Sequence, residues 1–175
     1  MGAADDAEAS EDDMGIIFLD YDGVVNTLLF EPGKDKPRYC FPRDGRVNNY
    51  QAIRWLNKLC KETDAKIVVT STWRSESNYK ECLYNGGLDK GVEVIGKTPD
   101  LCRLSRADEI REYINTHQDL FGDGFVIIDD EKSAGSLSPS RFVKCDTVRG
   151  FGLIEYLGAL KILQKWRKQK CTQQK

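Results

Sequence analysis

Two aspartates, Asp20 and Asp22, stand two residues apart directly after the apolar run Ile16–Leu19 and just before Gly23. If the extended backbone continues past the run, period-two geometry gives both carboxylates a similar direction. Neighbouring carboxylates repel, and both stay ionised only beside a cation or with a shared proton. A hard divalent ion meets that need, and Mg²⁺ is the usual candidate where phosphate is also present. One carboxylate can then attack phosphorus while the other handles the leaving-group proton.

Two other interpretations of this segment are a solvated Asp-Gly turn and a calcium-binding loop. An EF-hand loop requires an oxygen ligand and a glycine at the positions that Val24 and Val25 occupy. A plain turn explains Asp22 and Gly23, but it does not explain Asp20 at the end of an apolar run.

A second apolar run, Ile67–Thr70, leads into Ser71, Thr72 and Arg74. The hydroxyls and nearby backbone amides can hold phosphoryl oxygens, and Arg74 can bind a phosphate through two nitrogens. We therefore expect Thr70, Thr72 and Arg74 to contact phosphate or substrate. The N-cap of a helix would explain Ser71 or Thr72 equally well.

Asp129, Asp130 and Glu131 follow a third apolar run, Phe125–Ile128. If this run forms the strand beside the first, its acids complete a metal site with the two aspartates described above. The alternative interpretation is an acidic loop that binds nothing.

Five apolar runs predict the buried strands that must position these residues. They are Ile16–Leu19, Ile67–Thr70, Val92–Ile95 (the weakest), Phe125–Ile128 and Phe142–Cys145. Helical patterns separate them, so the chain predicts a three-layer, Rossmann-like α/β fold with a parallel sheet and helices on both faces. Ligands bind such sheets at the carboxyl ends of the strands, where the three polar segments are expected to meet.

Three segments carry the helical patterns. Apolar residues recur at helical spacing over Val47–Leu59. A second helix begins near Ser105, whose hydroxyl can cap the turn that contains Asp108. The third runs over about Leu153–Lys168, and its basic end interacts favourably with the helix dipole.

Composition and length favour one folded domain. The chain has 175 residues, of which 40% are hydrophobic and 31% charged. Acidic residues 1–14 and basic residues 169–175 are expected to be tails around a domain at 15–168. No run approaches the ~20 apolar residues of a membrane span, and no secretory signal opens the chain, so we expect no membrane partner and a cytoplasmic location.

The motifs resemble those of a known superfamily. Segments similar to the ordered motifs of the haloacid dehalogenase (HAD) superfamily are Asp20-x-Asp22-Gly23-Val24-Val25-Asn26, Thr70-Ser71-Thr72-Trp73-Arg74 and Ile128-Asp129-Asp130. More narrowly, they look like the small HAD domains of Swiss-army-knife RNA repair proteins. The resemblance spans about residues 15–157 and implies a HAD-like fold with a minimal cap or none.

The resemblance also implies roles for individual residues. Asp20 would be the nucleophile, Asp22 the acid and base, and Ser71, or Thr70 in its place, the phosphate-binding hydroxyl. The implied Mg²⁺ ligands are Asp20, Asp22, Asp129 and Asp130.

The third motif of the superfamily is a cation near the start of the helix that precedes the last acidic strand. Arg106 stands at such a start, and Lys97 and Arg103 compete with it. Asn26, which ends the first motif, is a further candidate for substrate binding.

These features predict a magnesium-dependent phosphohydrolase that forms an aspartyl-phosphate. Dehalogenases of the superfamily lack the second acid, so Asp22 favours phosphate chemistry. The alternative is a catalytically silent HAD-like domain that binds RNA or protein through its basic last helix, where Trp166 adjoins Arg167 and Lys168. Core packing would account for Trp166 as well.

The substrate prediction rests on the expected absence of a lid. The interval after the first motif is too short and too broken by proline for a folded cap, and only a flap at Leu28–Phe41 could partly cover the site. A nucleotide or a nucleic-acid terminal phosphate is therefore the expected substrate. The cations expected to attract its phosphates are Lys34, Lys36, Arg38 and Arg43.

Overall fold

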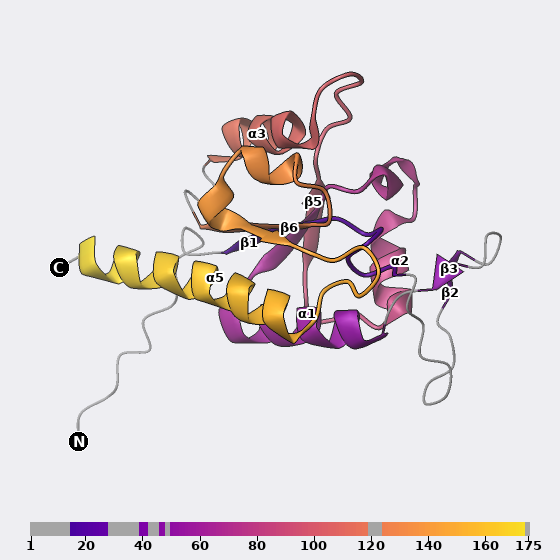
Figure 1. Ribbon diagram of the computed structural model, residues 1–175, viewed down its shortest axis with the longest axis horizontal. Coiled ribbons are helices and arrows are strands. Elements are labelled where there is room, and N and C mark those ends of the chain that lie inside the picture. Colours follow the sequence, from indigo (N-terminus) through magenta and orange to yellow (C-terminus); the bar gives the residue numbers. More distant parts are fainter. Residues whose placement is uncertain (1–14, 28–38, 42–45, 48–49, 119–123, 174–175) are drawn as a thin grey trace.

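The computed structural model describes residues 15–27, 39–41, 46–47, 50–118 and 124–173. Its centre is a five-stranded sheet in the order β5-β4-β1-β6-β7, in which every neighbouring pair is parallel (Figure 1). The strands are β1 (Ile16–Leu19), β4 (Lys66–Val69), β5 (Val94–Lys97), β6 (Phe125–Asp129) and β7 (Phe142–Lys144). The three runs with polar ends are thus the three adjacent strands β4, β1 and β6.

Helices cover both faces of this sheet, as the sequence predicts. They are α1 (Tyr50–Thr63), α2 (Tyr79–Gly86), α3 (Arg106–Thr116) and α5 (Leu153–Gln173). Figure 1 shows α1 and α5 on one side of the sheet and α3 on the other. The chain also forms short 3₁₀ turns η2 (Thr72–Ser75), η3 (Ala134–Ser136) and η4 (Pro139–Arg141).

Alternate side chains of β1 pack into two hydrophobic clusters, one on each face of the sheet, because successive residues of a strand point to opposite faces. Ile17 and Leu19 belong to the cluster that contains Leu56 of α1 and Leu163 of α5. The other two side chains, at positions 16 and 18, pack with Ile110 of α3 and its neighbours. This strand is buried on both faces, and the residues that follow it are therefore held firmly.

Several boundaries differ from the sequence prediction, β6 and β7 by one residue at their ends and four others as follows. Val47 lies in β3 (Arg46–Val47), which pairs antiparallel with β2 (Tyr39–Phe41), so the helix begins at Tyr50. The first apolar residue of the 92–95 run, Val92, lies in a turn whose amide bonds to Asp89, so β5 starts two residues later. The 67–70 run forms a strand one residue earlier, at 66–69. Finally, α5 continues to position 173 and includes most of the segment expected to be a basic tail.

Trp166 belongs to the core. It is 8% exposed, and its ring lies so close to Gly124 that an added Cβ there would be 2.3 Å from it. The alternative prediction, that this ring stacks with single-stranded nucleic acid, is inconsistent with its burial, and core packing is the correct interpretation.

Three predictions concern segments that lie wholly or mostly outside the described residues. They are the acidic tail at 1–14, the flap at 28–41, of which only 39–41 is described, and the cations at positions 34, 36, 38 and 43. Within the described part of the chain, no helix has both the length and the apolar character to cross a membrane.

The packing of α5 can be tested with two leucines of that helix. Leu163 is 1% exposed and Leu157 is 52% exposed. We expect Leu163→Ala to lower the free energy of unfolding by about 2–5 kcal/mol. Leu157→Ala, the matched control, should change it by less than about 1 kcal/mol. Urea denaturation measures both values, and equal losses would contradict this placement of α5.

Candidate active site

Strand register brings the polar segments together at the carboxyl edge of the sheet. Leu19 of β1 pairs with Val69 of β4 on one side and with Ile128 of β6 on the other. The next amides continue this pairing, since Asp20 N donates to Ile128 O at 3.1 Å and Thr70 N to Leu19 O at 2.8 Å. The residues that follow the three strands therefore start at the same level.

Three carboxylates form a cluster there. Within the described residues, Asp20, Asp129 and Asp130 each offer an oxygen, and these oxygens all lie within 4.8 Å of one another. Asp20 and Asp129 are buried and Asp130 is half-buried. Thr147 Oγ1 donates to Asp130 Oδ2 at 2.9 Å and so fixes the most exposed of the three.

The electrostatics of this cluster favour a cation. Burial raises the pKa of Asp20, although the neighbouring Arg106 opposes the shift. Burial also raises the pKa of Asp129, and the charge of Asp20 adds to that rise. Asp129 Oδ2 is buried without a hydrogen-bond partner among the described residues. An oxygen-only donor set with an unsatisfied buried carboxylate oxygen fits Mg²⁺, which binds carboxylates and offsets their repulsion.

Arg106 is the cation that reaches the cluster. Its Nη1 lies 2.6 Å from Asp20 Oδ1 and 3.3 Å from Asp129 Oδ2. It is the first residue of α3, and Ser105 caps that helix through a reciprocal capping box.

The two competing cations point elsewhere. Lys97 Nζ donates to the carbonyl oxygen of Arg74 at 2.7 Å. Arg103 is exposed and precedes the helix. Of the three candidates, Arg106 alone has a described contact with the acids.

Asp22 lies beside the cluster and is not part of it. β1 ends at Leu19 and the turn follows Asp22, at residues 23–25; among the described residues, the cluster contains Asp20 but not Asp22. Asp22 Oδ2 accepts from Trp73 Nε1 at 2.9 Å, and its Oδ1 accepts from Asn26 Nδ2 at 3.2 Å. The amide of Asn26, predicted to contact substrate, therefore holds this carboxylate.

The hydroxyls of the second motif have three different environments. Ser71 is the N-cap of η2 and accepts from Trp73 N. Burial raises the pKa of Asp20, and hydrogen bonding from the Ser71 side chain opposes that rise. The N-cap interpretation of Ser71 is therefore confirmed, and its role in binding phosphate stays a prediction. Thr70 is fully buried, with no hydrogen-bond partner for Oγ1 among the described residues, whereas Thr72 is exposed.

Arg74 differs from its predicted use. Its side chain is buried, with Nη2 2.6 Å from Glu109 Oε1, while Nη1 donates to the carbonyl oxygens of Thr70 and Ser71. A guanidinium whose terminal nitrogens are engaged in this way is not presented to a phosphate. Glu109 could not be predicted as its partner from the sequence, since the two residues lie 35 positions apart.

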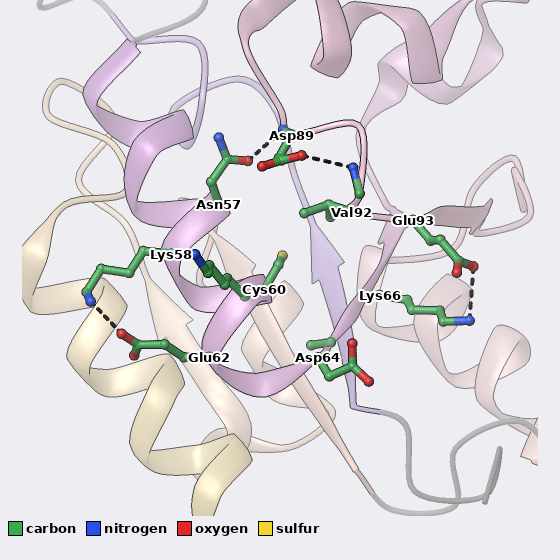
Figure 2. A pocket seen from close by; sticks show the side chains of 12 residues that line it. Asn57, Lys58, Cys60, Glu62, Asp64, Lys66, Asp89, Val92 and Glu93 are labelled. Atoms are coloured by element: carbon green, nitrogen blue, oxygen red, sulfur yellow. Dashed lines mark hydrogen bonds and ion pairs between the residues drawn. The ribbon is translucent and has the colours of Figure 1, made fainter. Parts of the chain in front are cut away.

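A cleft of about 720 Å³ lies away from the acids (Figure 2). It is lined by the last turns of α1, the start of β4 and the loop before β5, and Figure 2 shows Lys66 and Glu93 paired at its rim. Because β4 begins here and ends at the acidic cluster, the cleft is at the opposite edge of the sheet. Its charged groups largely pair with one another, so we assign the chemistry to the acids.

The fold and this arrangement of acids define a HAD-like α/β domain. A family model described as the HAD domain in Swiss Army Knife RNA repair proteins matches residues 16–153. The chain belongs to that family. No curated protein sequence matches it significantly.

Gly23 allows the first motif to lie close to Asp130 of the last acidic motif. It has a φ of 73°, and a Cβ there would lie 2.1 Å from Asp130 Oδ2. We expect Gly23→Ala to displace Asp130, to weaken Mg²⁺ binding measured by calorimetry, and to cost about 1–3 kcal/mol of stability. Gly91→Ala is the control, because its Cβ would meet only Asp89 Oδ1 at 3.5 Å. Unchanged stability and Mg²⁺ affinity in Gly23→Ala would reject this account.

Proposed function

We propose that the protein is a magnesium-dependent phosphohydrolase with Asp20 as its nucleophile. The observation that carries the proposal is the convergence of three carboxylates within 4.8 Å beside Arg106. Membership of the HAD family supports the same chemistry. Asp20, Asp129 and Asp130 would hold Mg²⁺, which when bound neutralises charge on the phosphoryl oxygens. Asp22 stays a predicted ligand without support from this cluster.

The first chemical step transfers the phosphoryl group to the protein. An oxygen of Asp20 forms a bond to phosphorus as the bond between phosphorus and the leaving oxygen breaks. Asp22 gives its proton to that oxygen, so the product leaves as a neutral alcohol. Ser71 and Arg106 would hold the phosphoryl oxygens and the nucleophile in line.

The second step releases inorganic phosphate. Asp22, now ionised, removes a proton from water as the water oxygen attacks phosphorus, and the bond from phosphorus to Asp20 breaks. Trp73 and Asn26 support this role because each holds one oxygen of the Asp22 carboxylate. Both residues would keep Asp22 beside the nucleophile without making it part of the acidic cluster.

A silent domain that binds RNA or protein is the second candidate function. Its specific support was Trp166 next to cations, and that ring is buried against Gly124. The buried acids Asp20 and Asp129 favour the catalytic function, because two buried carboxylates that share one arginine are costly unless a function retains them.

Turnover by variants tests the nucleophile. Asp20→Asn keeps the shape of the side chain but removes its nucleophilic charge, so we expect loss of at least about a thousandfold in kcat on an aryl phosphate with Mg²⁺. Asp64→Asn is the control, since Asp64 lines the cleft at the opposite edge of the sheet. A folded Asp20→Asn protein with wild-type turnover would refute the mechanism.

The substrate class is tested separately. The family description names RNA repair proteins, and we propose that a nucleotide or nucleic-acid terminal phosphate is the substrate. We expect a 3′- or 5′-phosphorylated oligonucleotide to have a higher kcat/KM than a hexose phosphate, with the advantage shrinking at high salt. Measuring both substrates at two salt concentrations decides this. A clear preference for the hexose phosphate would overturn the substrate assignment and leave the phosphatase mechanism intact.

A further inference from the structure

A buried ion pair contacts the backbone of the second motif, next to the proposed phosphate site. Arg74 of η2 and Glu109 of α3 are joined at 2.6 Å, and each side chain is only 8% exposed. Neither residue contacts the acidic cluster in any described interaction. The pair therefore takes no part in the proposed chemistry, although η2 and α3, the elements that carry it, also position Ser71 and Arg106.

On one side the pair is fixed to the second motif. Arg74 Nη1 donates to Thr70 O at 2.7 Å and to Ser71 O at 3.0 Å. The backbone of Arg74 is held in turn by Lys97, whose Nζ donates to its carbonyl oxygen. The guanidinium thus fastens the peptide that carries the Ser71 hydroxyl.

On the other side the pair is fixed to α3. Glu109 follows Arg106 by three residues, so both side chains lie on neighbouring positions of one helix face. Glu109 Oε1 also accepts from Leu101 N at 3.3 Å, which ties down the segment leading into the helix. Any shift of Glu109 along the helix axis would move Arg106 with it.

Stability alone is a weak reason for such a pair. Removing two charges from water costs free energy that their attraction repays only with excellent geometry, and apolar replacements are often neutral or stabilising. Here the geometry is incomplete, since Arg74 Nε is buried without a partner among the described residues. A directional contact between two elements, in contrast, sets their relative position.

We propose that Arg74 and Glu109 are positioning residues that set the separation of Ser71 and Arg106 on either side of Asp20. This inference rests on the proposed phosphatase function. Ser71 and Arg106 come from different elements, and both reach Asp20. The pair joins those two elements, whereas the Mg²⁺ candidates Asp129 and Asp130 follow β6 and do not depend on it.

The double variant Arg74→Met/Glu109→Leu tests this by replacing the ion pair with apolar side chains of similar volume. We expect it to fold with a Tm near that of the wild type and with Mg²⁺ affinity within about twofold. We expect kcat on an aryl phosphate to fall and KM to rise, by about 10- to 100-fold combined in kcat/KM. A crystal structure should show Arg106 Nη1 displaced from Asp20 Oδ1.

Two further variants keep the test decisive. If the double variant fails to fold, Glu109→Gln serves instead, because it removes the charge while keeping a hydrogen-bonding side chain. Arg74→Lys keeps the positive charge but lacks the planar guanidinium that binds several acceptors at once. We expect its kcat/KM to lie between those of the wild type and the double variant. Lys66→Gln, which breaks an ion pair at the opposite edge of the sheet, is the control and should leave kcat and KM unchanged.

The outcomes separate this inference from the phosphatase proposal. If the wild-type protein has no Mg²⁺-dependent turnover, the phosphatase proposal is wrong. The positioning role is then tested by the crystal structure of the double variant alone, through the position of Arg106. A folded double variant with wild-type kcat and KM, or with Arg106 still bonded to Asp20, would overturn the positioning role.

Discussion

The repulsion between Asp20, Asp129 and Asp130 is the constraint around which the carboxyl edge of the sheet is organised. Buried carboxylates cannot all stay ionised at this spacing without positive charge nearby. Arg106 supplies one such charge from the start of α3, to both Asp20 and Asp129, and the oxygen-only donor set of the three acids fits a divalent ion as a second. Surrounding contacts then serve to keep these groups close, including Thr147 on Asp130 and the capped start of α3.

Rigid support for this edge comes from the parallel sheet. β1 is buried on both faces and paired on both sides, so the position of Asp20 is fixed by the centre of the core. The second motif and the last acidic motif, Ile128-Asp129-Asp130, lie at the ends of its two neighbours in the sheet. Only Arg106 arrives from a helix, and it needs a separate connection to the motifs that follow strands. The buried contact between Arg74 and Glu109 meets that need in our account.

Much of this arrangement could be predicted from the sequence. Short apolar runs indicate buried strands, and the carboxyl ends of parallel strands, where the acids stand, meet at one edge of the sheet. That reasoning correctly placed Asp20 with Asp129 and Asp130. It was incomplete where the regular backbone ends: β1 stops at Leu19, and the Asp22 carboxylate accepts from Trp73 and Asn26 without joining the cluster. It failed where a partner is chosen by tertiary contact, as with Arg74, whose carboxylate lies 35 positions away on another element.

The central claim is that a phosphoryl group is transferred to Asp20, and trapping this intermediate tests it most directly. An acyl phosphate is reduced by borohydride to an alcohol, so protein quenched during turnover with Mg²⁺ and an aryl phosphate should contain homoserine at position 20. Peptide mass spectrometry identifies that site, and the same treatment without substrate is the control. The account predicts homoserine at position 20 alone. Steady turnover with an unmodified Asp20, or reduction at another carboxylate instead, would contradict it.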